Sequence, residues 1–383
     1  MLSSAGLRSG YCSLENDMRL PTYDEIKRDE RQLAVYEAPF DESLFVAGPP
    51  GSGKTVLVIR RAQMLLAKPD HSVMIITYNR MLRRLIAQLT AGEQRVQAQT
   101  MHSFVYGHYR EKANVTKVPE IKQYKLDWNV MFETLQRHGI HPHLTHVIID
   151  EGQDLPTEFF RYLRNFVATT VMVAADEEQA LRSERSTIRD IKEAAHLDDP
   201  FLFEYNHRNS PEIARVVEHF HTGDLPVPAV VRPKSGEIPC ILLYSENGAM
   251  RRIANWYQTR GGRIAVAVIQ NGTGEILYSQ LQENLSGDSI QIYTSSRRNE
   301  NDIELLKDGI TILNVESIKG QEFDTVFIME FDKLLLETNE MNQRKMYMLC
   351  ARARDHLFLM HEGNHLPPEL LRQLPGDDIL KRP

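Results

Sequence analysis

LFVAGPPGSGKTVLVIRRAQ, residues 44–63, joins a short apolar run to a helical pattern through a loop rich in glycine. The loop, GPPGSGKT at 48–55, fits the phosphate-binding pattern GxxxxGK[ST] at every fixed position. Glycines allow backbone N–H groups to surround a phosphate, and the N-terminus of the following helix adds partial positive charge. We therefore expect Lys54 to reach the β- and γ-phosphates of a nucleotide and Thr55 to bind Mg²⁺. The residues predicted to hold the nucleotide are Gly48, Pro49, Pro50, Gly51, Ser52, Gly53, Lys54 and Thr55.

Short apolar runs alternate with helical patterns along most of the chain. The predicted strands lie at 43–48, 72–78, 146–150, 170–176, 201–205, 240–245, 263–269, 289–295, 309–315, 325–331 and 356–362. The segments between them place apolar residues at i, i+3 and i+4, which is typical of amphipathic helices. Strands that alternate with helices form parallel sheets covered on both faces, and a proline-rich stretch at 222–239 separates two groups of strands. The sequence thus predicts an α/β protein with two parallel-sheet lobes that meet at a cleft.

The predicted domain boundaries follow from this alternation. Residues 1–22 are expected to form a flexible leader, 23–204 the first lobe and 205–362 the second lobe. A small insertion is expected at 105–145 within the first lobe, and a polar tail at 363–383.

The composition is ordinary for a globular protein, with 42% apolar and 25% charged residues. A net charge of −7 argues against a strongly basic coat, but it leaves room for a local basic groove. Cys12, Cys240 and Cys350 are far apart in the sequence, which predicts neither a disulfide framework nor a zinc site. No apolar run reaches the ~18 residues of a membrane span, and the N-terminus lacks the apolar core of a signal peptide. We expect a cytoplasmic protein with no membrane partner.

A pair of acids follows another predicted strand, in HVIIDEGQD at 146–154. A phosphate loop needs a metal-positioning carboxylate at the tip of a neighbouring strand, and Asp150 is expected to hold Mg²⁺ through its water shell. Glu151 is expected to take the proton from an attacking water, a role that depends on geometry more than on base strength.

The rest of the sequence narrows the class of nucleotide-dependent protein. The NKxD pattern that reads guanine in GTPases does not occur. Kinases of small molecules carry an arginine-rich lid on one compact domain, whereas this chain has a second α/β lobe with its own arginines. Two lobes around one nucleotide predict a motor-like engine, because the second lobe can sense the γ-phosphate and move when it leaves.

Eight further motifs occur in a fixed order. They are DERQLAVYEAP (29–39), ITYNRMLRRLI (76–86), TMHSF (100–104), DEGQD (150–154), AADEEQAL (174–181), YNHRNSPEI (205–213), NVESIKGQEFDTVFI (314–328) and YMLCARARDHL (347–357). Through them the chain resembles the UvrD/Rep-like superfamily 1 helicases from about residue 28 to residue 362. The resemblance implies two RecA-like domains with ATP and Mg²⁺ in the cleft between them.

The resemblance assigns roles at the base and ribose of the nucleotide. Gln32 would read the adenine, and Glu322 would contact the ribose with Gly320 beside it. His207 stands where the family has a tyrosine that stacks on adenine, and an imidazole can also stack; a loop histidine held by hydrogen bonds is the alternative. Arg60, shortly after the phosphate loop, is expected near the adenine.

The resemblance also assigns roles at the γ-phosphate. Gln179 would sense the γ-phosphate and link it to the strand-binding face. Arg208 would contact the γ-phosphate, and Arg352 would be the arginine finger. Guanidinium groups in these positions stabilise the charge that builds up on the transferred phosphoryl group.

Two of the motifs imply contacts with a single strand of nucleic acid. The implied contact residues are Tyr78, Asn79, Arg80, Thr100, His102 and Ser103. Tyr78 also fits a core position at a strand end, so this alternative remains open. Further basic residues expected on the strand-binding rim are Arg83, Arg84, Arg297, Arg298 and Lys319. The implied partner is single-stranded DNA, with RNA as the open alternative.

The chain departs from the family pattern in length and in one stacking position. The insertion at 105–145 is a vestige of the family's first accessory domain, and the second accessory domain is essentially absent. QALRSERS at 179–186 lacks the aromatic residue that stacks on a base in the family. Two functions are therefore expected: an ATP-dependent motor on a single strand, or an ATP-gated switch subunit of a larger complex, for example with a nuclease or another effector protein.

Overall fold

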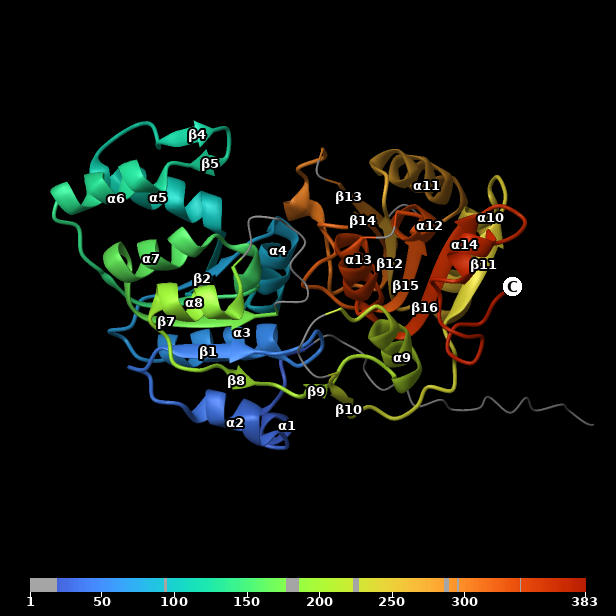
Figure 1. The fold of residues 1–383 in the computed structure, drawn as a ribbon, viewed down its shortest axis with the longest axis horizontal. Helices are drawn as coiled ribbons and strands as arrows, with labels where there is room; N and C mark the ends of the chain where they lie inside the picture. Colours follow the sequence, from blue (N-terminus) through green and yellow to red (C-terminus); the bar gives the residue numbers. More distant parts are fainter. Residues whose placement is uncertain are drawn as a thin grey trace, which may run out of the picture.

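The computed structural model describes residues 19–92, 95–176, 186–222, 227–285, 289–294, 296–337 and 339–383. These residues form two α/β lobes side by side, with helix α4 of the first lobe facing the second (Figure 1). No helix among the described residues is long and apolar enough to cross a membrane.

The first lobe is built on a six-stranded sheet in the order β3-β2-β6-β7-β1-β8, and every neighbouring pair is parallel. The strands are β1 Leu44–Ala47, β2 Val73–Thr77, β3 Gln97–Thr100, β6 Leu144–Ile149, β7 Ala168–Ala175 and β8 Phe201–Leu202. The helices of this lobe are α1 Tyr23–Ile26, α2 Glu30–Glu37, α3 Lys54–Leu66, α4 Arg80–Leu89, α5 Met101–Ala113, α6 Trp128–Arg137, α7 Thr157–Phe166 and α8 Ile188–Ala195.

The central strands of this sheet are mostly apolar and buried because both faces are covered. In β1, Leu44 and Val46 belong to one buried cluster, whereas Phe45 between them belongs to another. Alternate residues of a strand point to opposite faces, so the two clusters are the cores above and below the sheet.

The second lobe has a six-stranded parallel sheet in the order β11-β16-β15-β12-β14-β13. Its strands are β11 Cys240–Tyr244, β12 Arg263–Val268, β13 Ile290–Tyr293, β14 Gly309–Asn314, β15 Phe323–Met329 and β16 Ala353–Glu362. Its helices are α9 Pro211–His219, α10 Gly248–Arg260, α11 Asn271–Asn284, α12 Phe331–Leu335, α13 Glu340–Cys350 and α14 Pro368–Leu371. The prediction of two parallel-sheet α/β lobes is confirmed.

Two details differ from the predicted strands. The run 201–205 is split, since β8 joins the first sheet while β9 (Tyr205–Asn206) pairs with β10 (Ala229–Val230) in the connection between the lobes. Strand β3 was not predicted, because its sequence QAQT carries no apolar run; it lies at the edge of the sheet and pairs only with β2 among the described residues.

The predicted insertion 105–145 contributes a compact cap to the first lobe. An antiparallel hairpin, β4 (Glu120–Lys122) and β5 (Lys125–Leu126), lies between α5 and α6. In Figure 1 the hairpin and these two helices sit together at the outer end of the first lobe.

The C-terminal segment 363–383, expected as a polar tail, buries three leucines. Leu370, Leu374 and Leu380 are each at most 6% exposed. The backbone N–H of Ile241 donates to the carbonyl of Lys381, so the segment also lies along strand β11.

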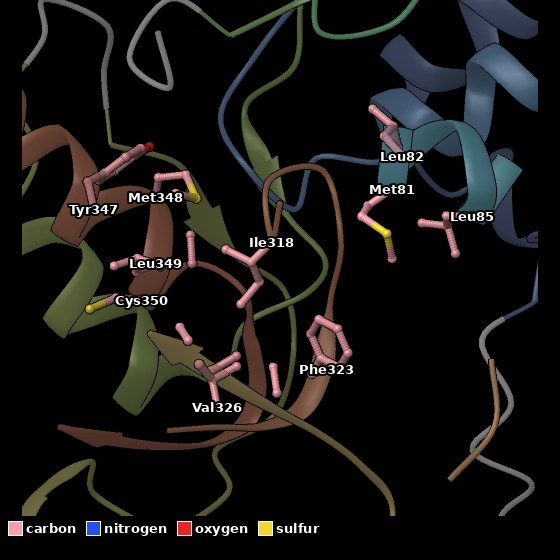
Figure 2. Close-up of a cluster of buried hydrophobic side chains, with 14 of the residues drawn as sticks. Met81, Leu82, Leu85, Ile318, Phe323, Val326, Tyr347, Met348, Leu349 and Cys350 are labelled. Carbon is pink, nitrogen blue, oxygen red and sulfur yellow. The ribbon is translucent and has the colours of Figure 1, made fainter. Parts of the chain in front are cut away.

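The two lobes share one apolar core cluster. It contains Met81, Leu82 and Leu85 of α4 together with Ile318 and Phe323 of the second lobe, and Figure 2 shows these two groups of side chains facing the space between the lobes. The close approach of the lobes at this point depends on Gly320, which has φ +78°; a Cβ there would lie 2.9 Å from the Leu82 side chain.

Candidate nucleotide-binding site between the lobes

The phosphate loop begins where β1 ends and closes where α3 begins. Gly51 and Gly53 have φ values of +78° and +87°, which favour glycine. Added Cβ atoms would lie 2.5 Å from Asn206 Oδ1 at Gly51 and 2.8 Å from Gln32 Nε2 at Gly53. The loop therefore needs both glycines, for its own conformation and for the close approach of its neighbours.

Lys54 is held inside the loop that it belongs to. Its Nζ donates to the carbonyls of Gly48 at 2.7 Å and Pro49 at 2.8 Å, and lies 3.9 Å from Asp176 Oδ2. Burial lowers the pKa of Lys54 against the opposing effect of the nearby carboxylates. The ammonium is thus placed at the centre of the loop, where a bound phosphate would be surrounded.

Asp150 lies directly after β6, beside the phosphate loop. The Thr55 side chain hydrogen-bonds to its carboxyl group, and the backbone N–H of Glu151 donates to Oδ1 at 3.1 Å. Burial, together with the neighbouring Glu151 charge, raises the pKa of Asp150 to about 7. Oδ2 is buried and makes no hydrogen bond within the described residues.

Glu151 takes a left-handed backbone conformation, with φ 58° and ψ 45°. Its Oε2 accepts a hydrogen bond from Gln153 Nε2 at 2.5 Å and lies 3.7 Å from Lys319 Nζ. Burial alone would raise the pKa of this carboxyl, but the charges of Lys319, Lys54 and Arg352 outweigh burial and lower the pKa. The carboxylate is therefore kept ionised at neutral pH.

The second lobe contributes two arginines. Arg208 Nε donates to Glu322 Oε2 at 2.7 Å, and its Nη1 donates to the carbonyl of Ala351 at 3.3 Å. Arg352 is 1% exposed and donates to the carbonyls of Met348 and Gln321. Burial and the neighbouring Arg208 charge lower the pKa of Arg352 to about 9, so Arg352 is still a cation at neutral pH.

The residues expected at the adenine of the nucleotide are connected by polar contacts. Gln32 Nε2 donates to the carbonyl of Ser52 at 3.0 Å, which places the side chain against the phosphate loop. The imidazole Nε2 of His207 lies 3.2 Å from Asp29 Oδ2, and the His207 backbone N–H donates to the carbonyl of Gly51 at 2.9 Å. His207 is thus a hydrogen-bonded link between the connection to the second lobe and the first lobe.

One cleft of about 880 Å³ brings the two sides together. The predicted residues that line it are Gln32, Pro50, Gly51, Ser52, Gly53, Lys54, Thr55, Glu151, His207, Arg208, Gly320, Glu322 and Arg352. Other lining residues were not predicted, among them Arg28, Tyr205, Arg232 and Arg354. Two of these could have been found, because Tyr205 alternates with His207 and Arg354 is the second arginine of the ARAR stretch.

Five residues predicted for the nucleotide site are not among the described residues that line the cleft: Gly48, Pro49, Arg60, Asp150 and Gln179. The Arg60 guanidinium donates to the carbonyls of Leu20 and Pro21 and thereby holds the chain that precedes α1; Arg60 itself does not line the cleft, although Pro21 does. Asp150 lies beneath the cleft wall, buried beside Thr55. Gln179 falls in 177–185, outside the described residues.

The predicted strand contacts separate into two groups. Tyr78 and His102 line a second cavity of about 480 Å³, next to the start of α5. Thr100 is the N-cap of α5 and accepts a hydrogen bond from the backbone N–H of Ser103, whose side chain lies at the surface.

Asn79 and Arg80 instead lie at the contact between the lobes. Asn79 is the N-cap of α4 and donates through Nδ2 to the carbonyl of Lys319 at 3.1 Å. Arg80 forms an ion pair with Glu300 at 3.5 Å.

Most of the expected basic rim is engaged in ion pairs. Lys319 was expected on the rim, but it is 3% exposed and pairs with Asp154 at 2.6 Å, because its side chain turns into the contact between the lobes. Arg84 pairs with Glu304 across that contact, and Arg297 pairs with Glu275 within the second lobe.

Comparison with known proteins agrees with this geometry. Residues 31–184 match the model of a protein family described as an AAA domain. No curated protein matches the chain.

Several solved structures match the chain at low sequence identity and with TM-scores below 0.5. The C-terminal domain of a possible DNA helicase from Lactobacillus plantarum WCFS1 is 16% identical, with a TM-score of 0.34, over 46% of this chain and 98% of that one. Arterivirus nonstructural protein 10, a helicase, is 12% identical with a TM-score of 0.41, over 88% of this chain and 62% of that one. The same viral protein in complex with DNA is 11% identical with a TM-score of 0.40, over 84% and 61%. This chain thus spans about three fifths of the length of the viral helicases that it matches.

Residues 31–184, most of the first lobe, are therefore similar to an AAA domain, and a second parallel-sheet lobe follows them. The matched residues include the predicted phosphate loop at 48–55.

Proposed function

We propose that the chain is an ATP-hydrolysing motor of the UvrD/Rep-like kind that acts on single-stranded nucleic acid, with DNA as the first substrate to test. One observation carries the proposal: Lys54 and Glu151 of the first lobe line the same cleft as Arg208 and Arg352 of the second. A nucleotide gripped from both lobes can connect hydrolysis to their relative movement.

The residues beside the phosphate loop fit a magnesium ion. Thr55 lies beside the Asp150 carboxyl group, and the buried Asp150 Oδ2 makes no hydrogen bond within the described chain, which suits an oxygen ligand. When bound, Mg²⁺ would neutralise charge on the β- and γ-phosphates.

Glu151 is the proposed base. Its carboxylate is ionised, fixed by Gln153 and oriented toward a cleft that also holds Lys54. It would accept a proton from the water that attacks the γ-phosphate, and the cations of the cleft would stabilise the charge on the phosphoryl group.

The two arginines divide the work on the second-lobe side. Arg208 is held by Glu322, and Arg352 is anchored to carbonyls of its own lobe, so both guanidinium groups move with that lobe. Opening of the cleft would withdraw them from the phosphate and stop hydrolysis. Gln32, against the phosphate loop, would read the adenine.

The direct test is a panel of ATPase measurements on the purified full chain. Turnover is measured without nucleic acid, and with single-stranded DNA, duplex DNA and single-stranded RNA. We expect stimulation by a single strand and none in a Lys54→Ala control. Turnover that ignores every single strand would exclude the motor.

The contact between the lobes favours a second candidate, an ATP-gated switch subunit of a larger complex. Arg80 and Arg84 of α4 are paired with Glu300 and Glu304, and a phosphate would have to compete with these carboxylates for them. A switch would hydrolyse ATP without moving along a strand, and its partner would be a protein such as a nuclease. Displacement of streptavidin from a biotinylated oligonucleotide supports the motor, whereas stable co-purification with an effector protein and no displacement support the switch.

A further inference from the structure

The second cavity is a concave, aromatic pocket that the nucleotide does not use. Its walls include Tyr78 after β2, His102 in the first turn of α5, Tyr124 in the β4–β5 turn and Trp128 at the start of α6. Its volume, about 480 Å³, lies in the range typical of pockets that bind small organic groups.

We propose that this pocket takes an unstacked base of a single strand of nucleic acid. The inference rests on the proposed function, since it names where the strand is gripped. The stretch QALRSERS has no aromatic residue on which a base could stack. In this proposal Tyr124 and Trp128 of the insertion provide the stacking surface instead.

The charge of the pocket decides which part of a strand can enter. Its walls carry three carboxylates, Asp127, Asp154 and Glu158, and one ammonium group, Lys125. Carboxylates repel phosphates, but they accept hydrogen bonds from the amino groups of cytosine and adenine. The pocket therefore suits a base, with the phosphates outside it.

The hairpin that forms one wall is held in place. Glu120 accepts hydrogen bonds from the Tyr106 hydroxyl and from the backbone N–H of Tyr124. His102 Nε2 lies 3.2 Å from the carbonyl of Tyr124, and the two rings meet edge to face at 6.2 Å. The aromatic walls are thus positioned before any ligand arrives.

Tyr124 is an unusual residue for its position. It is 59% exposed and has φ 64°, a left-handed conformation in which glycine or asparagine is normal. A large aromatic side chain kept at a strained and exposed turn points to a use for the ring itself.

The pocket also reaches the nucleotide site through one chain of contacts. Asp154, in its wall, pairs with Lys319 at 2.6 Å, and Lys319 lies 3.7 Å from Glu151. A base held beside Asp154 would therefore lie two side chains from the proposed catalytic carboxylate.

The chain offers a direct optical test. It has two tryptophans, Trp128 and Trp256, so Trp256→Phe leaves Trp128 as the only tryptophan emitter. We expect oligo(dC) and oligo(dA) to quench its fluorescence, and oligo(dT) to do so more weakly. An abasic oligonucleotide of equal length should not quench. Equal quenching by the abasic strand would overturn the assignment, because phosphate contacts would then suffice.

Two variants test the walls without depending on an unfolded protein. Tyr124→Asn suits the left-handed turn, so the variant should melt no lower than the parent while its affinity for oligo(dC), measured by anisotropy, falls by about 5- to 100-fold. Ile121→Ala should also weaken binding, whereas Ile276→Ala, at a similarly exposed position on α11, should not; the two isoleucines are 66% and 61% exposed.

The outcomes separate this inference from the proposed function. If a single strand stimulates the ATPase of the parent, but Tyr124→Asn leaves the affinity for the oligonucleotide unchanged, the proposed motor stands and the proposed base pocket is refuted. A parent that binds and responds to no single strand loses both.

Discussion

The two sides of the nucleotide cleft are built differently. The first-lobe side is mainly backbone, a loop closed by two left-handed glycines with Lys54 folded into it. The second-lobe side is made of long guanidinium side chains, Arg208 and Arg352, held by a carboxylate and by carbonyls. Under the proposed function, this difference would let the first lobe bind the phosphates and the second lobe respond to the charge that changes during hydrolysis.

The largest expected effects come from the first-lobe side. Glu151→Gln should lower hydrolysis by about 10²- to 10⁴-fold, because the amide cannot accept the proton. It should still bind ATP, whereas Lys54→Ala should lose both binding and hydrolysis. Steady-state ATPase and titration with a fluorescent ATP analogue separate the two. Glu193→Gln, at an exposed site of α8, is the control and should behave as the parent.

Arg352→Ala tests the second-lobe side. Turnover should fall by about 10³-fold, as for other arginine fingers, with little change in ATP affinity. Arg352→Lys should not restore turnover, because an ammonium lacks the planar fork of donors. Arg354→Ala, two residues along and lining the same cleft, is the matched control. Equal losses for Arg352→Ala and Arg354→Ala would refute the finger assignment.

Replacement of Asp150 is expected to change the free energy of unfolding in a pH-dependent way, which is a smaller effect than those on hydrolysis. Its folded pKa is raised to about 7 from 3.8, so the folded state holds a proton that the unfolded state releases between those values. The free energy of unfolding therefore falls as pH rises through this window. In metal-free buffer, Asp150→Asn should raise the free energy of unfolding by roughly 1–3 kcal/mol at pH 8, with no gain below about pH 4.

For Asp190 we expect the opposite dependence on pH: its contribution to the free energy of unfolding should rise, not fall, as the pH rises. The Thr187 backbone N–H and hydroxyl bond its carboxylate and lower its pKa. The hydrogen-bonded carboxylate stabilises the fold at pH values above the pKa that Asp190 has in the unfolded chain. This stabilisation is lost as the pH falls through the lower pKa that it has in the folded protein. Asp190→Asn should thus reduce the free energy of unfolding at neutral pH, and denaturant titrations from about pH 2 to pH 8 cover the pH windows of both variants. A destabilised Asp150→Asn at pH 8 would contradict the account of that site.

The sequence predicted the two sheets and the first-lobe side of the cleft because both depend on local patterns. Buried strands are continuous apolar runs, and a phosphate loop is a short contiguous motif. Arg208 and Arg352 were predicted through a family resemblance, since residues 144 positions apart cannot be joined by spacing alone.

What could not be predicted depends on contacts between distant segments. The ion pair that buries Lys319 joins it to Asp154, 165 residues earlier in the chain. Arg60 was expected near the adenine, but its rotamer directs it to the carbonyls of 20–21. The pocket around Tyr124 needed the fold of the insertion, where QYKL carries no motif.

The smallest expected effect concerns the contact between the lobes. Arg84 Nε donates to the carbonyl of Ile303 at 3.0 Å, and its Nη2 pairs with Glu304 at 3.1 Å. Arg84→Gln should lower the free energy of unfolding by about 0.5–1 kcal/mol, and less in high salt, because the pair is partly exposed. Arg189→Gln, which removes an exposed pair within α8, should cost less still.

Urea titrations at low and high salt decide what holds the lobes together. A small, salt-sensitive loss leaves the apolar contact of Leu82 with the Gly320 backbone as the main joint. In that case Leu82→Ala should cost about 2–5 kcal/mol, as for other buried leucines. If Arg84→Gln instead lowers the free energy of unfolding as much as Leu82→Ala does, the ion pairs are the main interaction that holds the lobes together. That result would favour a switch, in which charge controls the separation of the lobes, over a motor, in which the nucleotide controls it.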